Sequence, residues 1–159
     1  MSGKMPTSNS SGIWTAALNW IAAVRFLVDT NVVSELRKGG RCNPGVARWF
    51  SQAEDETLYL SVLVLGELQR GADRIRRRDT RSAAALDRWL ASLARDYAPR
   101  ILPITLAIAR TWGSFGVPDP ISTVDGLLAA TAHEHGLTLV TRNVNDVAST
   151  GVATLNPFA

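Results

Sequence analysis

Cysteine is almost absent from this chain, because Cys42 is the only one among 159 residues. One thiol can form no intramolecular disulfide and supplies too few ligands for a thiolate zinc site. The sequence therefore excludes a small secreted domain held together by disulfides and a zinc-ribbon protein. It favours a protein of the reducing cytoplasm.

Long hydrophobic runs are missing as well. A helix needs about 20 apolar residues to span a bilayer, and no stretch of this chain supplies them, so we predict no membrane association. A signal peptide is not predicted, because Lys4 is the only early positive charge and no cleavage site is clear. Residues 1–24 are interpreted as an N-terminal extension outside the core, from an upstream start site, a cloning remnant or a partner-binding helix. The predicted domain spans residues 25–159.

Several catalytic signatures do not occur. There is no GxGxxG or GxxxxGK loop to bind phosphates and no GxSxG turn to present a nucleophilic serine. The two histidines, His133 and His135, are two positions apart and would point in different directions on a helix. These absences argue against a dinucleotide-binding enzyme, a P-loop NTPase, a serine hydrolase and a zinc hydrolase.

Short apolar runs alternate with helical patterns along the rest of the chain. Strands are predicted over residues 25–29, 57–60, 100–102, 137–141 and 152–155. Helices are predicted over residues 31–37, 44–53, 61–78, 80–97, 105–115 and 122–135, the last of them amphipathic. Such alternation implies an α/β domain whose strands pair in parallel through right-handed crossovers.

Four acidic residues, far apart in the sequence, each follow a short apolar run: Asp29, Glu67, Asp125 and Asp146. The carboxyl ends of parallel strands meet at one edge of a sheet, so all four can face one crevice. Carboxylates gathered there repel one another unless a divalent cation lies between them. A metal site of acidic oxygens in a small basic protein suggests phosphodiester chemistry.

Each acid also has a structural interpretation. Asp29 at a strand end is suited to cap the following helix, and Asp125 can form a capping pair with Ser122. Glu67 can lie on the helix surface beside a neighbouring arginine. Asp146 lies in the predicted loop TRNVND, where polar residues are usually turn formers.

Positive charge is concentrated in one segment. The formal net charge is only +3, but fifteen of the seventeen basic residues are arginines. Six of these lie within twelve residues: Arg70, Arg74, Arg76, Arg77, Arg78 and Arg81. Arginine matches phosphate oxygens well, yet such a run is equally typical of a solvated helix face. The sequence leaves both interpretations open.

Taken together, these motifs resemble the PIN-domain ribonucleases, and the chain is similar to the VapC-type toxins of bacterial toxin–antitoxin pairs, in the FitB-like branch. The matching stretches follow one another between residues 26 and 158: FLVDTNVVSELR, LYLSVLVLGELQRGA, RILPI, VDGLLAATAHEHGLTLVTRN and LNPF. The resemblance implies a three-layer α/β/α sandwich with a short, mostly parallel central sheet. It also implies an endoribonuclease that depends on Mg²⁺ or Mn²⁺ and cleaves RNA with a metal-activated water.

The same resemblance assigns roles to particular residues. Metal-binding and catalytic roles fall on Asp29, Asp125 and Glu67, and the fourth position is open between Asp146 and Asn143. The supporting polar residues are Thr141, Asn143 and Asn31, and the candidates for RNA phosphate contacts are Arg70, Arg74 and Arg77. The implied partners are an RNA substrate, a cognate antitoxin that occludes the crevice, a second copy in a homodimer, and promoter DNA through the antitoxin complex.

Two other functions remain as alternatives. One is a catalytically inactive PIN-like binding or regulatory module. The other is a phosphatase of the haloacid dehalogenase type, which also has an Asp at the end of its first strand. That enzyme needs a second Asp two residues later, where this chain has Asn31, so the sequence argues against it.

Overall fold

Short runs of leucine, valine and other apolar residues form the central strands, because such runs are suited to strands that are covered on both faces. The structure, a computed structural model, describes residues 24–158. Its strands are Phe26–Val28 (β1), Leu58–Ser61 (β2), Ile101–Leu102 (β3), Thr138–Val140 (β4) and Thr154–Leu155 (β5). They form one sheet in the order β3-β2-β1-β4-β5, with every neighbouring pair parallel. The predicted parallel sheet is confirmed.

Six α-helices connect these strands: Thr30–Leu36 (α2), Pro44–Gln52 (α3), Val62–Arg76 (α4), Thr80–Asp96 (α5), Leu106–Ser114 (α6) and Thr123–His135 (α7). Short 3₁₀ turns cover Gly39–Arg41 (η1), Asp55–Thr57 (η2), Ala98–Arg100 (η3) and Val144–Thr150 (η4). Each α-helix begins after a polar residue whose side chain accepts a bond from a free backbone N–H of the first turn. This is why the predicted helix starts lie within one residue of those observed.

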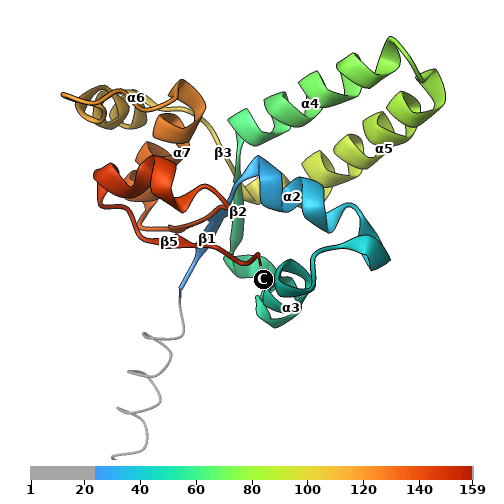
Figure 1. The fold of residues 1–159 in the computed structure, drawn as a ribbon, viewed down its shortest axis with the longest axis horizontal. Coiled ribbons are helices and arrows are strands. Elements are labelled where there is room, and N and C mark those ends of the chain that lie inside the picture. The colour runs from blue at the N-terminus through green and yellow to red at the C-terminus, as the bar shows by residue number, and fades with distance from the viewer. Residues whose placement is uncertain (1–23, 159) are drawn as a thin grey trace, which may run out of the picture.

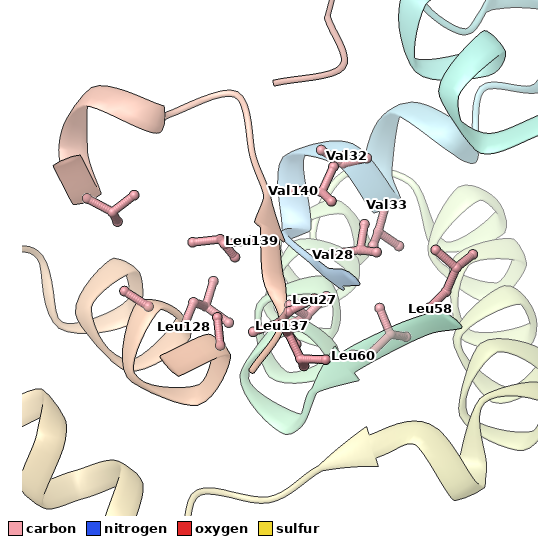
Figure 2. Packing of buried hydrophobic residues seen from close by; sticks show 14 of the residues in the cluster. Leu27, Val28, Val32, Val33, Leu58, Leu60, Leu128, Leu137, Leu139 and Val140 are labelled. Atoms are coloured by element: carbon pink, nitrogen blue, oxygen red, sulfur yellow. The ribbon is translucent and has the colours of Figure 1, made fainter. Parts of the chain in front are cut away.

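The helices cover both faces of the sheet (Figure 1). On one face α7 packs on the strands, and α6 packs against α7. On the other face lie α2, α3 and α5. Figure 2 shows Leu128 of α7 beside Leu139 of β4, while Val33 of α2 lies next to Val28 of β1. The predicted three-layer α/β/α sandwich is therefore confirmed. The predicted extension over residues 1–24 lies, except for Val24, outside the described residues.

Two local expectations are wrong. Helix α7 is not amphipathic along its whole length, because residues 128–132 are all buried between the sheet and α6. The segment around Asp146 is not an open loop but the 3₁₀ turn η4. In both cases the conformation or burial of the segment depends on packing against a distant part of the chain. A local sequence pattern cannot predict such packing.

Glycine at position 126 lets α6 approach α7 directly beside Asp125. A Cβ built there would lie 2.8 Å from Cδ1 of Trp112, so Gly126→Ala is expected to destabilise the protein by about 1–3 kcal/mol through overpacking. Gly71→Ala in α4 is the matched control, because a Cβ there meets nothing within 4 Å and should stabilise the helix by about 0.5–1 kcal/mol. Urea unfolding measures both changes. Equal stability of the two variants would contradict the close approach.

Candidate acidic active site

Asp29 stands where β1 ends and α2 begins. Its backbone N–H donates to the carbonyl oxygen of Val140 at 2.9 Å, which extends the pairing of β1 with β4. Its side chain is the N-cap of α2, and Oδ1 accepts from the backbone N–H of Thr30 at 2.6 Å. Only 6% of the residue is exposed. The capping interpretation is thus confirmed, and the carboxylate is held rigidly at the carboxyl edge of the sheet.

The second carboxylate oxygen of Asp29 is held by two other side chains. The buried hydroxyl of Thr141 donates to Oδ2 at 2.7 Å, and the amide of Asn31 approaches the same oxygen at 3.4 Å. The Thr141 hydroxyl in turn accepts from the backbone N–H of Asn143 at 3.0 Å. Thr141, expected as a supporting polar residue, thus contacts the Asp29 carboxylate directly. A carboxylate has about four acceptor sites, so these three donors leave Asp29 with room for one more partner.

Glu67 joins Asp29 through a residue that the sequence analysis did not single out. It lies in the second turn of α4, and its Oε2 accepts a short hydrogen bond from the hydroxyl of Thr30. Thr30 therefore connects two acids that are far apart in the sequence. The only signal for it was its place directly after Asp29.

Asp125 occupies the first turn of α7, whose N-cap is Ser122. The Ser122 hydroxyl accepts from the backbone N–H of Asp125 at 3.3 Å and donates to its Oδ2 at 2.7 Å. The predicted capping pair is confirmed.

The pKa of Asp29 is raised above its ordinary value near 3.8. Burial is the largest cause, since it removes water from the charged form. The hydrogen bonds from Thr141 and Thr30 oppose that shift, while the negative charges of Asp125 and Glu67 add to it. Asp29 is thus close enough to Asp125 and to Glu67 for their negative charges to act on its carboxylate.

In the described part of the chain, no basic side chain forms an ion pair with Asp29, Glu67 or Asp125. This is notable in a chain with seventeen basic residues. An oxygen-rich group with uncompensated negative charge matches the preference of hard divalent cations such as Mg²⁺.

The carboxylates do not form a finished metal-binding cluster. In the described part of the chain, no three or more His, Cys, Asp and Glu side chains are gathered closely enough to hold an ion together. Asp146 is exposed in η4, its backbone N–H donates to the carbonyl oxygen of Asn143 at 3.1 Å, and its carboxylate forms no hydrogen bond within residues 24–158. The structure thus brings three of the predicted acids into one electrostatic group, and the choice between Asp146 and Asn143 stays a prediction.

The end of the described chain also reaches the site. The backbone N–H of Arg142 donates to Oδ1 of Asn31 at 3.3 Å, so Asn31 links α2 to the segment after β4. The Arg142 guanidinium lies over the ring of Phe158, 4.9 Å from its centroid. Phe158 of the stretch LNPF therefore contacts Arg142, the residue whose backbone is hydrogen-bonded to Asn31.

An apolar cavity of about 380 Å³ lies next to the site but contains none of the acids. It is lined by the sheet and by α2, α3 and α5, it opens to the surface, and its walls include Val28, Val33, Phe50, Trp89 and Leu93. Val28 directly precedes Asp29, so the cavity and the acidic group share one strand end.

Among the described residues, no helix has the length and apolar character needed to cross a membrane.

Comparison with known proteins gives consistent results. A family described as PIN domain matches residues 26–148. Toxin FitB of Neisseria gonorrhoeae is 30% identical over 138 residues, which cover 84% of this chain and 98% of that protein. VapC ribonuclease Y4jK of Sinorhizobium fredii is also 30% identical over 138 residues, covering 84% of this chain and 97% of the relative.

Solved structures agree in fold. The crystal structure of FitAcB from Neisseria gonorrhoeae has a TM-score of 0.76 and 31% identity, and the match covers 83% of this chain and 97% of that one. The structure of FitAB bound to an IR36 DNA fragment has a TM-score of 0.76 and 28% identity, covering 84% and 96%.

Proposed function

Because the chain belongs to the PIN domain family, we propose that it is a divalent-metal-dependent endoribonuclease and the toxin of a toxin–antitoxin pair. The observation that carries this proposal is the buried Asp29 carboxylate, which lies in the field of Asp125 and Glu67 and has no ion-pair partner within the described residues. The names of the relatives, a toxin and a VapC ribonuclease, support the same activity.

The residues that would hold the cation are Asp29 and Asp125, with Glu67 completing the site and Asp146 as the fourth candidate. Mg²⁺ or Mn²⁺ bound there would supply the activation of a water and the neutralisation of phosphate charge. The oxygen donors and the free acceptor site on Asp29 fit such an ion.

The chain's own residues prepare this site. Thr141 and the backbone N–H of Thr30 fix the Asp29 carboxylate, so that its orientation does not change when substrate arrives. Ser122 fixes Asp125 in the same way. Glu67, aligned by Thr30, is the residue we assign to accept the proton of the attacking water.

A toxin of this class needs an inhibitor that covers the site. We propose that an antitoxin inserts apolar side chains into the cavity beside Asp29, since an open apolar cavity is a typical protein-binding feature. Binding to promoter DNA would then occur through the antitoxin complex, in line with the DNA-bound FitAB relative. The homodimer stays a prediction.

The proposal is tested by RNA digestion with the purified chain. Cleavage of transfer, ribosomal or messenger RNA is expected with Mg²⁺ or Mn²⁺, with products carrying a 5′-phosphate and a 3′-hydroxyl. EDTA should stop the reaction and excess Mg²⁺ should restore it, because a carboxylate site without its cation cannot neutralise the phosphate. If no RNA is cut under any metal condition, the chain is an inactive binding module instead.

A further inference from the structure

Helix α4 has two chemically different faces. One face packs against α5 through apolar residues: Leu65, Leu68, Ala72 and Ile75. The opposite face carries Glu67, Arg70 and Arg74, and the C-cap residue Arg77 continues the row, because the spacings are three, four and three residues. Figure 1 shows α4 leaving the end of β2 and running outward from the sheet. The row therefore begins at the acidic site and continues away from it.

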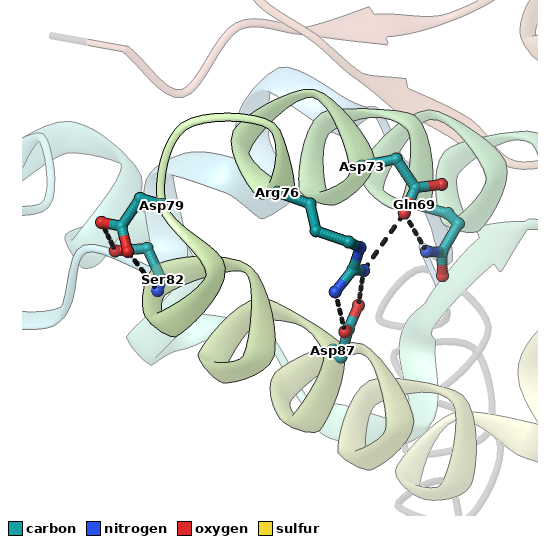
Figure 3. A network of polar contacts seen from close by, with 6 residues as sticks. All are labelled: Gln69, Asp73, Arg76, Asp79, Ser82 and Asp87. Atoms are coloured by element: carbon teal, nitrogen blue, oxygen red, sulfur yellow. Dashed lines mark hydrogen bonds and ion pairs between the residues drawn. The ribbon is translucent and has the colours of Figure 1, made fainter.

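The remaining arginine of this helix has a different role. Arg76 lies towards α5 and forms ion pairs with Asp73 at 3.1 Å and with Asp87 of α5 at 2.9 Å (Figure 3). Gln69 donates to the same Asp73 carboxylate at 3.3 Å. Arg76 thus ties the α4–α5 hairpin together and shares its single positive charge between Asp73 and Asp87.

The three arginines of the row have no such partner. Arg70, Arg74 and Arg77 are exposed and form no ion pair or side-chain hydrogen bond within residues 24–158. They line a shallow hollow of about 400 Å³, whose other walls are Gly66, Gln69 and Asp73. The hollow has three arginines against the single carboxylate of Asp73, which shares Arg76 with Asp87, so its net charge is positive.

We propose that single-stranded RNA lies along this face of α4, with successive phosphates on Arg70, Arg74 and Arg77. This inference rests on the proposed nuclease function and names how its substrate is held. From Glu67 to Arg77 the helix rises about 15 Å, at 1.5 Å per residue, so the row leads a strand of a few nucleotides to the acids. One row of guanidinium forks follows one phosphate backbone, and such contacts give affinity and register without sequence preference.

The test measures binding without metal, so that it is independent of cleavage. A fluorescein-labelled single-stranded RNA of mixed sequence is titrated in EDTA at several salt concentrations, with the natural chain and with the triple variant Arg70→Gln, Arg74→Gln and Arg77→Gln. Each phosphate contact contributes about 0.7 to the slope of log affinity against log salt, so the variant should lose about 2 from that slope. Between 50 and 200 mM salt, the factor by which the affinity falls should be about 20 times larger for the natural chain than for the variant.

The matched control changes the same net charge elsewhere. Arg48→Gln, Arg88→Gln and Arg110→Gln remove three exposed arginines from α3, α5 and α6 that form no salt bridge in the described structure. This variant should keep the natural salt slope. All proteins are first compared by thermal unfolding, to confirm that the exposed substitutions leave the fold unchanged.

Two results would overturn the proposal: an unchanged slope in the α4 variant, or an equal loss in the control. A third would be a duplex DNA that binds more tightly than the RNA and shows the same slope change, which would make α4 a DNA-binding face. If binding behaves as expected but no RNA is cleaved with metal, the nuclease function fails while the RNA-binding face stands.

Discussion

Asp29→Asn is expected to lower RNA cleavage by about 10²- to 10³-fold or more, the usual effect of removing one charge-stabilising group from an active site. Asn keeps the size of Asp and remains a good N-cap for α2, so the fold should persist. What disappears is the negative charge that makes the site attractive to a divalent cation. The measurement is the cleavage rate at saturating Mg²⁺, with the natural chain prepared in parallel.

The same substitution should change how the stability of the metal-free protein depends on pH. Folding raises the pKa of Asp29 above 3.8, so the folded state holds this proton more tightly than the unfolded chain does. Stability is therefore lost as pH rises from about 4 through the raised pKa, and Asn avoids that loss. In EDTA, the unfolding midpoint of the natural chain should fall relative to that of the variant as pH rises from about 4 to 7, because residue 29 of the variant does not titrate.

Asp79→Asn is the control for this experiment. Asp79 is also an N-cap, at the start of α5, but it is exposed, and the hydrogen bonds from Ser82 lower its pKa. The same chemical change there should leave cleavage intact and should not stabilise the protein. Mg²⁺ should raise the unfolding midpoint of the natural chain and of Asp79→Asn, but not of Asp29→Asn. Full activity in Asp29→Asn would remove the site assignment.

Thr141→Val is the second substitution with a large expected effect. It preserves shape but removes the hydroxyl that donates to Asp29 at 2.7 Å and accepts from the backbone N–H of Asn143. Loss of a hydrogen bond to a buried charged group costs about 1.5–3 kcal/mol of stability. Because the Asp29 carboxylate also loses its orientation, cleavage at low Mg²⁺ should fall by about 10- to 100-fold.

Thr131→Val provides the comparison for this effect. Thr131 is just as buried, but its hydroxyl donates only to the backbone carbonyl of Leu127 within α7. Its substitution should leave the Mg²⁺ dependence of cleavage unchanged. In Thr141→Val, added Mg²⁺ should recover part of the lost rate, whereas a purely structural defect would give a loss that no Mg²⁺ concentration reduces.

Much of this structure could be predicted from local sequence. The run FLVD predicts a buried strand that ends in an acid, and β1 ends at Val28, directly before Asp29. Ser61 and Ser122 predict helix starts, because a short polar side chain can satisfy a free N–H of the first turn. These features depend on neighbours a few residues away, so a sequence pattern is enough to find them.

Other features could not be predicted in this way. The five buried residues 128–132 of α7 reflect the packing of α6 on the side away from the sheet. The pairing of Thr30 with Glu67 joins residues 37 positions apart. The position of Asp146 outside the hydrogen-bonded network depends on how η4 folds after β4. Each depends on where distant segments meet.

The sequence by itself determined the order of strands and helices, the helix caps and the identity of the acids, because hydrophobic periodicity and capping act over a few residues. Only the tertiary structure decided which acids share one electrostatic environment, which hydroxyls hold them, and which arginines of α4 remain unpaired. Those outcomes depend on the parallel pairing of β1 with both β2 and β4. This pairing buries Asp29 at the end of β1, and the burial raises the pKa of its carboxyl group.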